Sequence, residues 1–339
     1  MYSHCVVGAG VSGLILLLLL AETGIPLDSI VVIDPYFDGG DLARKWSTVI
    51  SNTPWSKTYT SLKDKLSSIP MPAWAQELPM ETPTSVLQIA RLLREMARPL
   101  FNSIRMIQGL VKEAKYDTTV WTIRIKNDQV IKASNIYFTF GSEPTQLDLP
   151  IPTIPLEVAL NAPVLASYIQ PTDKLIVFGT AHSGTLILKN LADIRARAVG
   201  IYRGEKPFLF ARDGVYTGIK MDAERYADEI LEGKYPTIKL INSANISDLI
   251  RETRTATWCI YATGFERRNI IRLNVNGEAK DLGRYSATSG KITDCPNAWG
   301  FGIAYPSQAP DGINFDVGIS SFIEHIAKTL AHRDNLKNT

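Results

Sequence analysis

The strongest indication of the fold lies near the N-terminus, in the segment Cys5-Val-Val-Gly-Ala-Gly-Val-Ser-Gly13. Its apolar beginning predicts a short strand, its glycines predict a tight turn, and the apolar run from Leu14 to Thr23 predicts a helix. A second apolar run, Ile30 to Ile33, predicts a buried strand that ends at Asp34. Strand, turn, helix and strand in this order form a βαβ unit.

The turn matches the GxGxxG pattern at Gly8, Gly10 and Gly13, which binds dinucleotides when a strand precedes it and a helix follows. The first glycine permits the tight turn, the second lets a pyrophosphate approach the backbone, and the third lets helix and strand pack closely. Asp34 lies 21 positions beyond Gly13 and is the expected acceptor of a ribose hydroxyl. The alternative is a glycine-rich turn in an unrelated α/β fold.

The same order of elements returns about 170 residues later. Lys174 to Phe178 predicts a strand, Gly179 to Gly184 (GTAHSG) a turn, 185–194 a helix, and Ala198 to Tyr202 the next strand. This turn lacks the middle glycine. Its histidine, His182, is interpreted as a loop residue near a pyrophosphate and not as a catalytic base. Arg203 follows the second strand, where a cation suits the 2′-phosphate of NADP, although a solvated surface arginine is the alternative. Two nucleotide-binding units imply two nucleotides that meet at an interface, and FAD with NADPH is the natural pair.

Between the two units the pattern is weaker. We expect a loop region from Asp34 to about Pro83, an amphipathic helix from Ser85 to Met96, a strand from Val120 to Ile125 and two strands within Val130 to Phe138. The final helix is expected from Val317 to His332.

Proline-rich residues 143–155 predict a crossing between domains. Residues 1–150 are expected to form the first part of an FAD-binding domain, 151–264 an NAD(P)H-binding domain, and 265–339 the C-terminal part of the FAD-binding domain. The expected fold class is α/β, with two Rossmann-like domains of which the second is inserted into the first.

Composition excludes several classes of protein. The 339 residues are 45% hydrophobic and 21% charged, with a formal net charge of +2, so nothing indicates nucleic-acid binding. The three cysteines form no CxxC pair and the four histidines are scattered, so neither a dithiol centre nor a metal site is expected. The apolar run Leu14 to Ala21 is too short to span a membrane, and only Met-Tyr-Ser-His precedes Cys5, unlike a signal peptide. We expect a cytoplasmic protein with reduced thiols and no stable membrane insertion, and the sequence leaves a homodimer open.

These motifs together resemble the flavoproteins with two dinucleotide-binding domains, and most of all the flavin-containing monooxygenases. Further similarity lies in Gly39-Gly-Asp-Leu42 with Trp46, in Ser51-Asn-Thr-Pro54, in Trp121 and in Ala262-Thr-Gly-Phe265. The resemblance implies FAD and NADPH as cofactors and a catalytic Asn52 that hydrogen-bonds beside the flavin, where an oxygen adduct is held. The cofactor-binding residues that it and the glycine motifs imply are Gly8, Gly10, Val11, Ser12, Gly13, Asp34, Pro35, Gly40, Leu42, Trp46, Asn52, Thr53, Gly141, Gly179, Ser183, Gly184, Arg203, Gly264, Asp316 and Val317.

The chain also departs from this family. The family's Phe-x-Gly followed by His is absent, and Val164-Leu-Ala-Ser167 stands roughly in its place. The usual Gly-Asp of the third FAD contact is missing, and its nearest substitutes are Gly300-Phe-Gly302 and Asp316-Val-Gly318.

The leading functional hypothesis is an NADPH-dependent flavin monooxygenase that forms a flavin hydroperoxide and oxygenates a small nucleophilic substrate with dioxygen. One alternative is an NAD(P)H-dependent flavin reductase that passes electrons to a non-dithiol acceptor. Another is an FAD-binding protein without turnover. Phe208 to Tyr216 is expected either to line a substrate pocket or to form a lid packed on the second domain.

Overall fold

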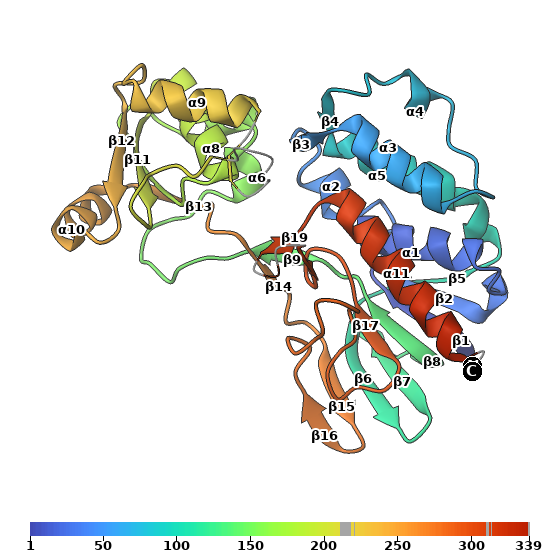
Figure 1. Cartoon of the computed structure of the whole chain (residues 1–339). Helices are drawn as coiled ribbons and strands as arrows, with labels where there is room; N and C mark the ends of the chain where they lie inside the picture. The colour runs from blue at the N-terminus through green and yellow to red at the C-terminus, as the bar shows by residue number, and fades with distance from the viewer. Residues whose placement is uncertain (211–217, 220, 310–311, 313, 338–339) are drawn as a thin grey trace. The chain divides into compact units, whose positions relative to one another are not determined.

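The computed structural model describes residues 1–210, 218–219, 221–309, 312 and 314–337 (Figure 1). The chain divides into two compact units. Unit 1 comprises Met1–Glu143 and Arg267–Thr339, and unit 2 comprises Pro144–Glu266. The boundaries expected from the sequence were 150/151 and 264/265, whereas this division falls at 143/144 and 266/267. The α/β fold class is confirmed, because both units contain parallel sheets flanked by helices.

Unit 1 is built on a sheet in the order β16-β15-β6-β7-β8-β1-β2-β5, with β17 also paired to β8. Its parallel part brings the ends of β1, β2, β8 and β17 to one edge, next to the first glycine turn. The parallel strands are β1 (Tyr2–Val7), β2 (Ile30–Asp34), β5 (Arg105–Gln108), β8 (Val130–Phe138) and β17 (Ala298–Gly300). The remaining strands pair antiparallel, apart from the parallel pair β15–β6, and they are β6 (Val111–Asp117), β7 (Val120–Ile125), β15 (Arg272–Val275) and β16 (Glu278–Lys280).

Helix α1 (Val11–Glu22) lies at the centre of unit 1. It packs against α5 (Val86–Ala97) and α11 (Ile319–Lys337), and α11 packs in turn against α3 (Trp55–Lys65) (Figure 1). The seven residues Leu14 to Leu20 are each at most 5% exposed. Because neighbours cover it on all sides, this helix is apolar all round and not amphipathic. Among the described residues, no helix is long and apolar enough to span a membrane.

Unit 2 contains a parallel four-stranded sheet in the order β12-β11-β10-β13. The strands are β10 (Lys174–Phe178), β11 (Arg197–Tyr202), β12 (Ile238–Asn242) and β13 (Trp258–Tyr261). The helices are α6 (Leu156–Ala159), α7 (Ala162–Tyr168), α8 (His182–Asp193), α9 (Asp222–Leu231) and α10 (Ile246–Thr255). The two segments that link the units, β9 (Ser142–Pro144) and β14 (Phe265–Arg267), pair with each other.

The predicted loop between Asp34 and Pro83 is wrong. This region contains α2 (Asp41–Arg44), β3 (Ile50–Pro54), α3, α4 (Trp74–Glu77) and β4 (Pro83–Ser85). Helix α3 was missed because it is mostly polar and buries only Trp55, Thr58 and Leu62, so its apolar pattern is too sparse to stand out.

Two smaller expectations also fail. Val130 to Phe138 is one continuous strand and not two, and the final helix begins at Ile319 and not at Val317. Val317 instead follows β19 (Phe315–Asp316), which pairs with β18 (Ser307–Gln308).

Candidate functional site

The first glycine turn has the geometry that its sequence predicts. Gly8 has φ of +105°, and a Cβ placed there would lie 2.7 Å from the carbonyl oxygen of Thr139. A Cβ on Gly13 would lie 2.0 Å from the carbonyl oxygen of Gly8. Side chains at either position would therefore push α1 away from the ends of β1 and β8.

Gly10 plays a different part in this turn. Its φ of −70° and ψ of −172° are open to any residue, and the atom nearest to a Cβ would be Gly40 Cα at 3.8 Å. The first hydrogen bond of α1 runs from the Leu14 N–H to the Gly10 carbonyl at 2.9 Å, so the three preceding N–H groups have no carbonyl to bond within the helix. The first turn of α1 contains no acidic residue. A bare helix start beside a residue without a side chain fits the pyrophosphate of a dinucleotide.

The Gly39-Gly40 turn lies directly against Gly10. Gly10 and Gly39 form a parallel β-bridge, and a Cβ on Gly40 would lie 2.8 Å from Gly10 Cα. The turn continues into α2, where Leu42 packs against the core and Trp46 N–H donates to the Asp41 carbonyl at 3.0 Å. The structure thus brings the Gly-Gly segment, recognised from family resemblance, to the first glycine turn.

Asp34 has a structural role that sequence reasoning missed. The residue is 8% exposed, and its Oδ2 accepts a hydrogen bond from the Ala9 N–H at 2.7 Å. Oδ1 accepts from the N–H groups of Tyr36 and Phe37, both at 2.8 Å. An ionised carboxylate can accept about four hydrogen bonds, so capacity for a ribose hydroxyl remains on Oδ2. The backbone at Pro35 is also fixed in position, because its carbonyl accepts a hydrogen bond from Gln108 Nε2 at 3.0 Å.

The two candidate replacements for the family's Gly-Asp pair lie on different elements. Phe301 N–H donates to the Phe138 carbonyl at 3.0 Å, which continues the pairing of β17 with β8. A Cβ on Gly302 would lie 2.0 Å from Ser12 Oγ, so this glycine lies against the first glycine turn. Asp316 ends β19, and the exposed Val317 follows it just before α11.

Asn52 lies on the short strand β3 and its side chain is exposed. The neighbouring Ser51 Oγ donates to the Thr53 carbonyl at 2.7 Å, which stiffens the backbone around Asn52. The expectation that Asn52 lies in a loop is therefore wrong, while its role in chemistry stays a prediction.

The second glycine turn repeats the first in detail. Gly179 has φ of +91°, and a Cβ there would lie 2.4 Å from the Ala262 carbonyl oxygen. A Cβ on Gly184 would lie 2.0 Å from the Gly179 carbonyl oxygen, the same distance as for the first pair. The Thr185 N–H donates to the Ala181 carbonyl at 2.9 Å and so makes the first helix bond. His182 and Ser183 are the first residues of α8, so their N–H groups lie at its positive end.

Ala181 explains why the degenerate motif still folds. Its φ of −68° and ψ of −170° match those of Gly10 within a few degrees, so the turn needs no glycine here. The Ala181 side chain is exposed at the place where Gly10 leaves open space.

The ends of the second strands differ between the units. Tyr202 follows the pair Phe178–Ile201 as Asp34 follows Val7–Ile33, so a tyrosine replaces the carboxylate. Arg203 is the next residue, it is exposed, and no ion pair joins it to another described residue.

Gly141 and Gly264 flank the linking strands β9 and β14. Both have positive φ, +75° and +98°. Because no atom of a described residue lies within 4 Å of a Cβ on Gly264, the positive φ is the reason found for a glycine at this position.

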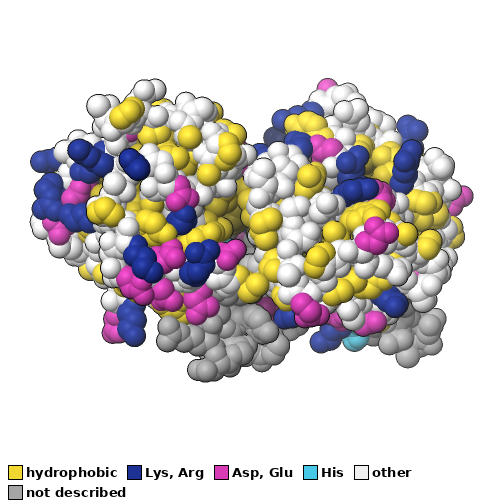
Figure 2. Space-filling model, turned by 90° about the horizontal axis from the view of Figure 1, so that it is seen from above, with side chains coloured by type: hydrophobic (Ala, Val, Ile, Leu, Met, Phe, Trp, Pro, Cys, Tyr) yellow, Lys and Arg dark blue, Asp and Glu magenta, His cyan; other side chains and the backbone are white. Residues whose placement is uncertain are grey.

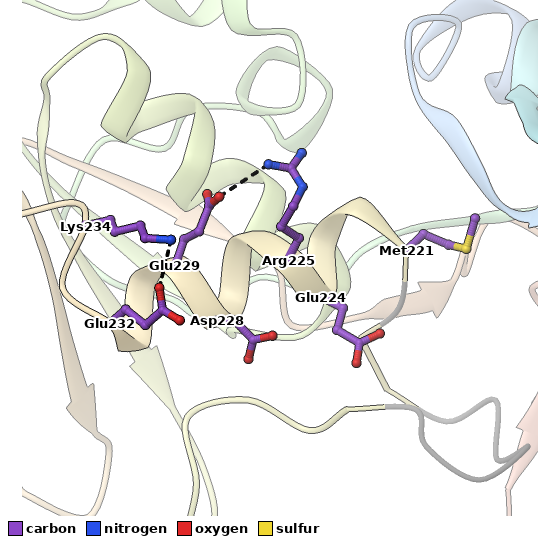
Figure 3. A pocket seen from close by; sticks show the side chains of 7 residues that line it. All are labelled: Met221, Glu224, Arg225, Asp228, Glu229, Glu232 and Lys234. Carbon is purple, nitrogen blue, oxygen red and sulfur yellow. Dashed lines mark hydrogen bonds and ion pairs between the residues drawn. The ribbon is translucent and has the colours of Figure 1, made fainter.

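A shallow pocket on α9 has a different character. It is lined by Met221, Glu224, Arg225, Asp228, Glu229, Glu232 and Lys234 (Figure 3). Arg225 pairs with Glu229 at 3.4 Å and Lys234 with Glu232 at 2.8 Å. Its charged lining and lack of a glycine turn mark a solvated helix face and not a dinucleotide site.

Neither a metal centre nor a thiol centre is present among the described residues. No group of three His, Cys, Asp or Glu side chains gathers there, and the three cysteines are all buried and form no disulfide. Acidic and basic side chains are interspersed on the face drawn in Figure 2. Of the segment Phe208 to Tyr216, residues 211–216 lie outside the described part of the chain.

Comparison with known proteins agrees with this geometry. No family model matches the chain. The chain is 26% identical to "Monooxygenase AgnR1" of Paecilomyces divaricatus over 378 residues, which cover 95% of each chain. Among solved structures, a flavin-containing monooxygenase from Stenotrophomonas maltophilia aligns with a TM-score of 0.64 and 14% identity, over 99% of both chains. The bacillithiol disulfide reductase of Staphylococcus aureus aligns with a TM-score of 0.67 and 13% identity, also over 99% of both. OTEMO in complex with FAD and NADP aligns with a TM-score of 0.58 and 13% identity, over 98% of this chain and 86% of that one.

The fold is that of the flavoproteins with two dinucleotide-binding domains. Within that class, the resemblance to flavin-containing monooxygenases predicted from the sequence is confirmed at the level of the fold.

Proposed function

We propose that this chain is an FAD-dependent oxidoreductase, and that it acts as an NADPH-dependent monooxygenase on a small nucleophilic substrate. The observation that carries the proposal is the pair of glycine turns with the same geometry, one in each unit. The similarity to a protein named monooxygenase over 95% of its length supports the finer assignment.

FAD is assigned to unit 1. Gly10 and the N–H groups at the start of α1 would bind its pyrophosphate, and Asp34 Oδ2 would accept from its ribose. Gly40, Leu42 and Trp46 would follow the cofactor further along. The other proposed contacts in unit 1 are Gly8, Val11, Ser12, Gly13, Pro35, Asn52, Thr53, Gly141, Asp316 and Val317. FAD supplies hydride acceptance from reduced nicotinamide and the activation of dioxygen, and the protein supplies position and exclusion of water.

NADPH is assigned to unit 2, with Gly179, Ser183 and Gly184 at its pyrophosphate and Gly264 near the linking strand. Tyr202 at the place of Asp34 removes the carboxylate that would select NAD, and Arg203 offers a guanidinium to a 2′-phosphate. Arg203→Gln should raise the KM for NADPH and leave that for NADH nearly unchanged. Equal changes for both cofactors would show that Arg203 is not the phosphate ligand.

Asn52 is proposed as the catalytic residue. Its exposed carboxamide can donate a hydrogen bond where negative charge develops during oxygen transfer, and losing such a donor costs about 100-fold or more in rate. Asn52→Ala should keep FAD content and NADPH-dependent reduction normal, while more of the consumed NADPH appears as hydrogen peroxide. Asn102→Ala is the matched control, because Asn102 is also exposed but lies on the 3-10 turn Arg98–Asn102.

The decisive measurement is NADPH oxidation under oxygen, with and without added nucleophilic substrate, together with the yield of oxygenated product. If the chain is instead a flavin reductase, its electron acceptor is proposed not to be a dithiol partner, because the three cysteines of this chain are buried and form no disulfide that could relay electrons to one. A reductase would oxidise NADPH anaerobically with an added electron acceptor and form no oxygenated product. An FAD-binding protein without turnover would contain FAD that NADPH does not reduce.

A further inference from the structure

Arg268 holds together two turns that are far apart in sequence. It is the second residue of unit 1 after the chain returns from unit 2. Its Nη1 donates to the Phe140 carbonyl at 3.1 Å, and its Nη2 pairs with Asp41 Oδ2. The side chains of Arg268 and Asp41 are only 22% and 17% exposed. Two directed contacts from one half-buried guanidinium define its position.

Both partners of Arg268 lie next to the first glycine turn. A Cβ on Gly8 would lie 2.9 Å from Phe140 Cα, so the Phe140 turn touches the start of the glycine turn. Asp41 directly follows Gly40, whose own Cβ would lie 2.8 Å from Gly10 Cα. Arg268 therefore links the two backbone segments that flank Gly8 and Gly10 on either side.

The charges around Asp41 indicate that Arg268 also balances negative charge, in addition to linking the two turns. Asp41 Oδ1 also accepts from Arg44 Nη2 at 2.9 Å, and Arg44 Nε pairs with Asp38 Oδ2 at 3.0 Å. Arg44 is thus shared between two carboxylates, and Arg268 supplies the second cation that balances them. A dinucleotide pyrophosphate beside Gly10 is an anion, and an Asp41 carboxylate left without Arg268 would repel it.

We propose that Arg268 is a positioning residue for FAD, which acts by neutralising Asp41 and by tying the Gly39–Asp41 turn to the Phe140 turn. The proposal rests on the proposed binding of FAD in unit 1. Arg268 works through Asp41 and does not itself contact the cofactor. This distinguishes it from an arginine that grips a phosphate directly.

The test is the dissociation constant of FAD, measured by flavin fluorescence on FAD-free protein at low and high salt. Arg268→Gln should weaken FAD binding about tenfold or more, because it leaves the partly buried carboxylates of Asp38 and Asp41 with Arg44 as their one cationic partner among the described residues. The loss should shrink at high salt, where repulsion is screened. Arg272→Gln is the matched control, since Arg272 is exposed on β15.

The double variant separates the two kinds of arginine. If Arg268 acts through Asp41, then Asp41→Asn combined with Arg268→Gln should bind FAD more tightly than Arg268→Gln alone. A double variant as weak as Arg268→Gln, or weaker, would overturn the proposal in favour of direct phosphate binding or a purely structural role. Arg268→Lys should recover most of the affinity, because it keeps the cation.

Asp41→Asn alone decides the matter if Arg268→Gln fails to fold. It removes the negative charge and keeps an acceptor for Arg268, so FAD binding should be unchanged or tighter. A tenfold loss would overturn the proposal. A wild-type chain that binds no FAD refutes the proposed function and this inference together, whereas FAD binding that is equal in wild type and Arg268→Gln refutes only the inference.

Discussion

Gly10→Ala should separate folding from cofactor binding. The Gly10 backbone lies in a region open to alanine, and an added Cβ would have Gly40 Cα, at 3.8 Å, as its nearest neighbour. Two effects on folding then oppose each other. Alanine restricts the unfolded chain, which stabilises by about 0.4–1 kcal/mol, and it is a poorer N-cap than glycine, which costs a similar amount. We expect the free energy of unfolding to change by less than about 1 kcal/mol.

The same methyl group would stand where the pyrophosphate has to approach the backbone. Forcing an extra methyl group into a close contact costs about 1–3 kcal/mol, which corresponds to FAD binding weaker by about 5- to 150-fold. The geometry thus predicts a normal fold and impaired binding from a single carbon atom.

Urea unfolding of FAD-free protein, followed by tryptophan fluorescence, measures the first quantity, since Trp55 and Trp121 are at most 1% exposed. Titration with FAD measures the second. Gly13→Ala is the contrasting control, because its Cβ would lie 2.0 Å from the Gly8 carbonyl oxygen and should prevent folding. A Gly10→Ala protein that is destabilised by about 2 kcal/mol or more, or that binds FAD like the wild type, would refute the reasoning.

Three further changes test other parts of the structure. Ala181→Gly should lower the KM for NADPH severalfold with little change in stability, and an unchanged KM would contradict a pyrophosphate at Ala181. Asp34→Asn should lower the free energy of unfolding by about 2 kcal/mol, because an NH2 donor replaces one of the two carboxylate oxygens that accept hydrogen bonds from backbone N–H groups. An unchanged urea midpoint would show that these hydrogen bonds are not made. Burial, together with the positive charge of Lys328, lowers the pKa of His325 from 6.5 to about 4. As the pH drops from 6.5 towards 4, the unfolded chain therefore takes up a proton at His325 before the folded chain does, and the free energy of unfolding falls. His325→Leu should remove about 2 kcal/mol of the stability difference between pH 8 and pH 5, measured by urea unfolding at both, and an unaltered pH dependence would exclude His325 as its source.

The glycine turns could be predicted because their constraints are local. The positive φ of Gly8 and the close approach of Gly13 to the Gly8 carbonyl oxygen both arise within the first βαβ unit, so these two requirements are written into nearby residues, whereas the approach of Gly8 to Thr139 is not. The second turn was recognised without its middle glycine for the same reason, since Ala181 has nearly the dihedral angles of Gly10.

Other parts of the site depend on contacts that no local pattern reveals. Asp41 and Arg268 are 227 positions apart, and neither lies in a motif that indicates a partner. Gly302 against Ser12 is a similar case, because the contact exists only once β17 has joined β8. The backbone role of Asp34 was hidden for another reason: the ribose interpretation already accounted for a carboxylate at that position.

The comparison of the two turns argues for two different ligands. Where a glycine is needed for packing, the units agree, since Gly8 corresponds to Gly179 and Gly13 to Gly184 with the same close approaches. Where a side chain would face a ligand, they differ, with Gly10 against Ala181 and Asp34 against Tyr202. Differences at these two positions are expected if each unit keeps the fold but binds its own nucleotide, and they favour the proposed assignment of FAD to the unit that retains glycine and carboxylate. In the other unit, Arg203 suits a nucleotide that carries an extra phosphate. Ala181 suits a nucleotide that binds less closely, as expected of a cofactor that enters and leaves the protein in every turnover.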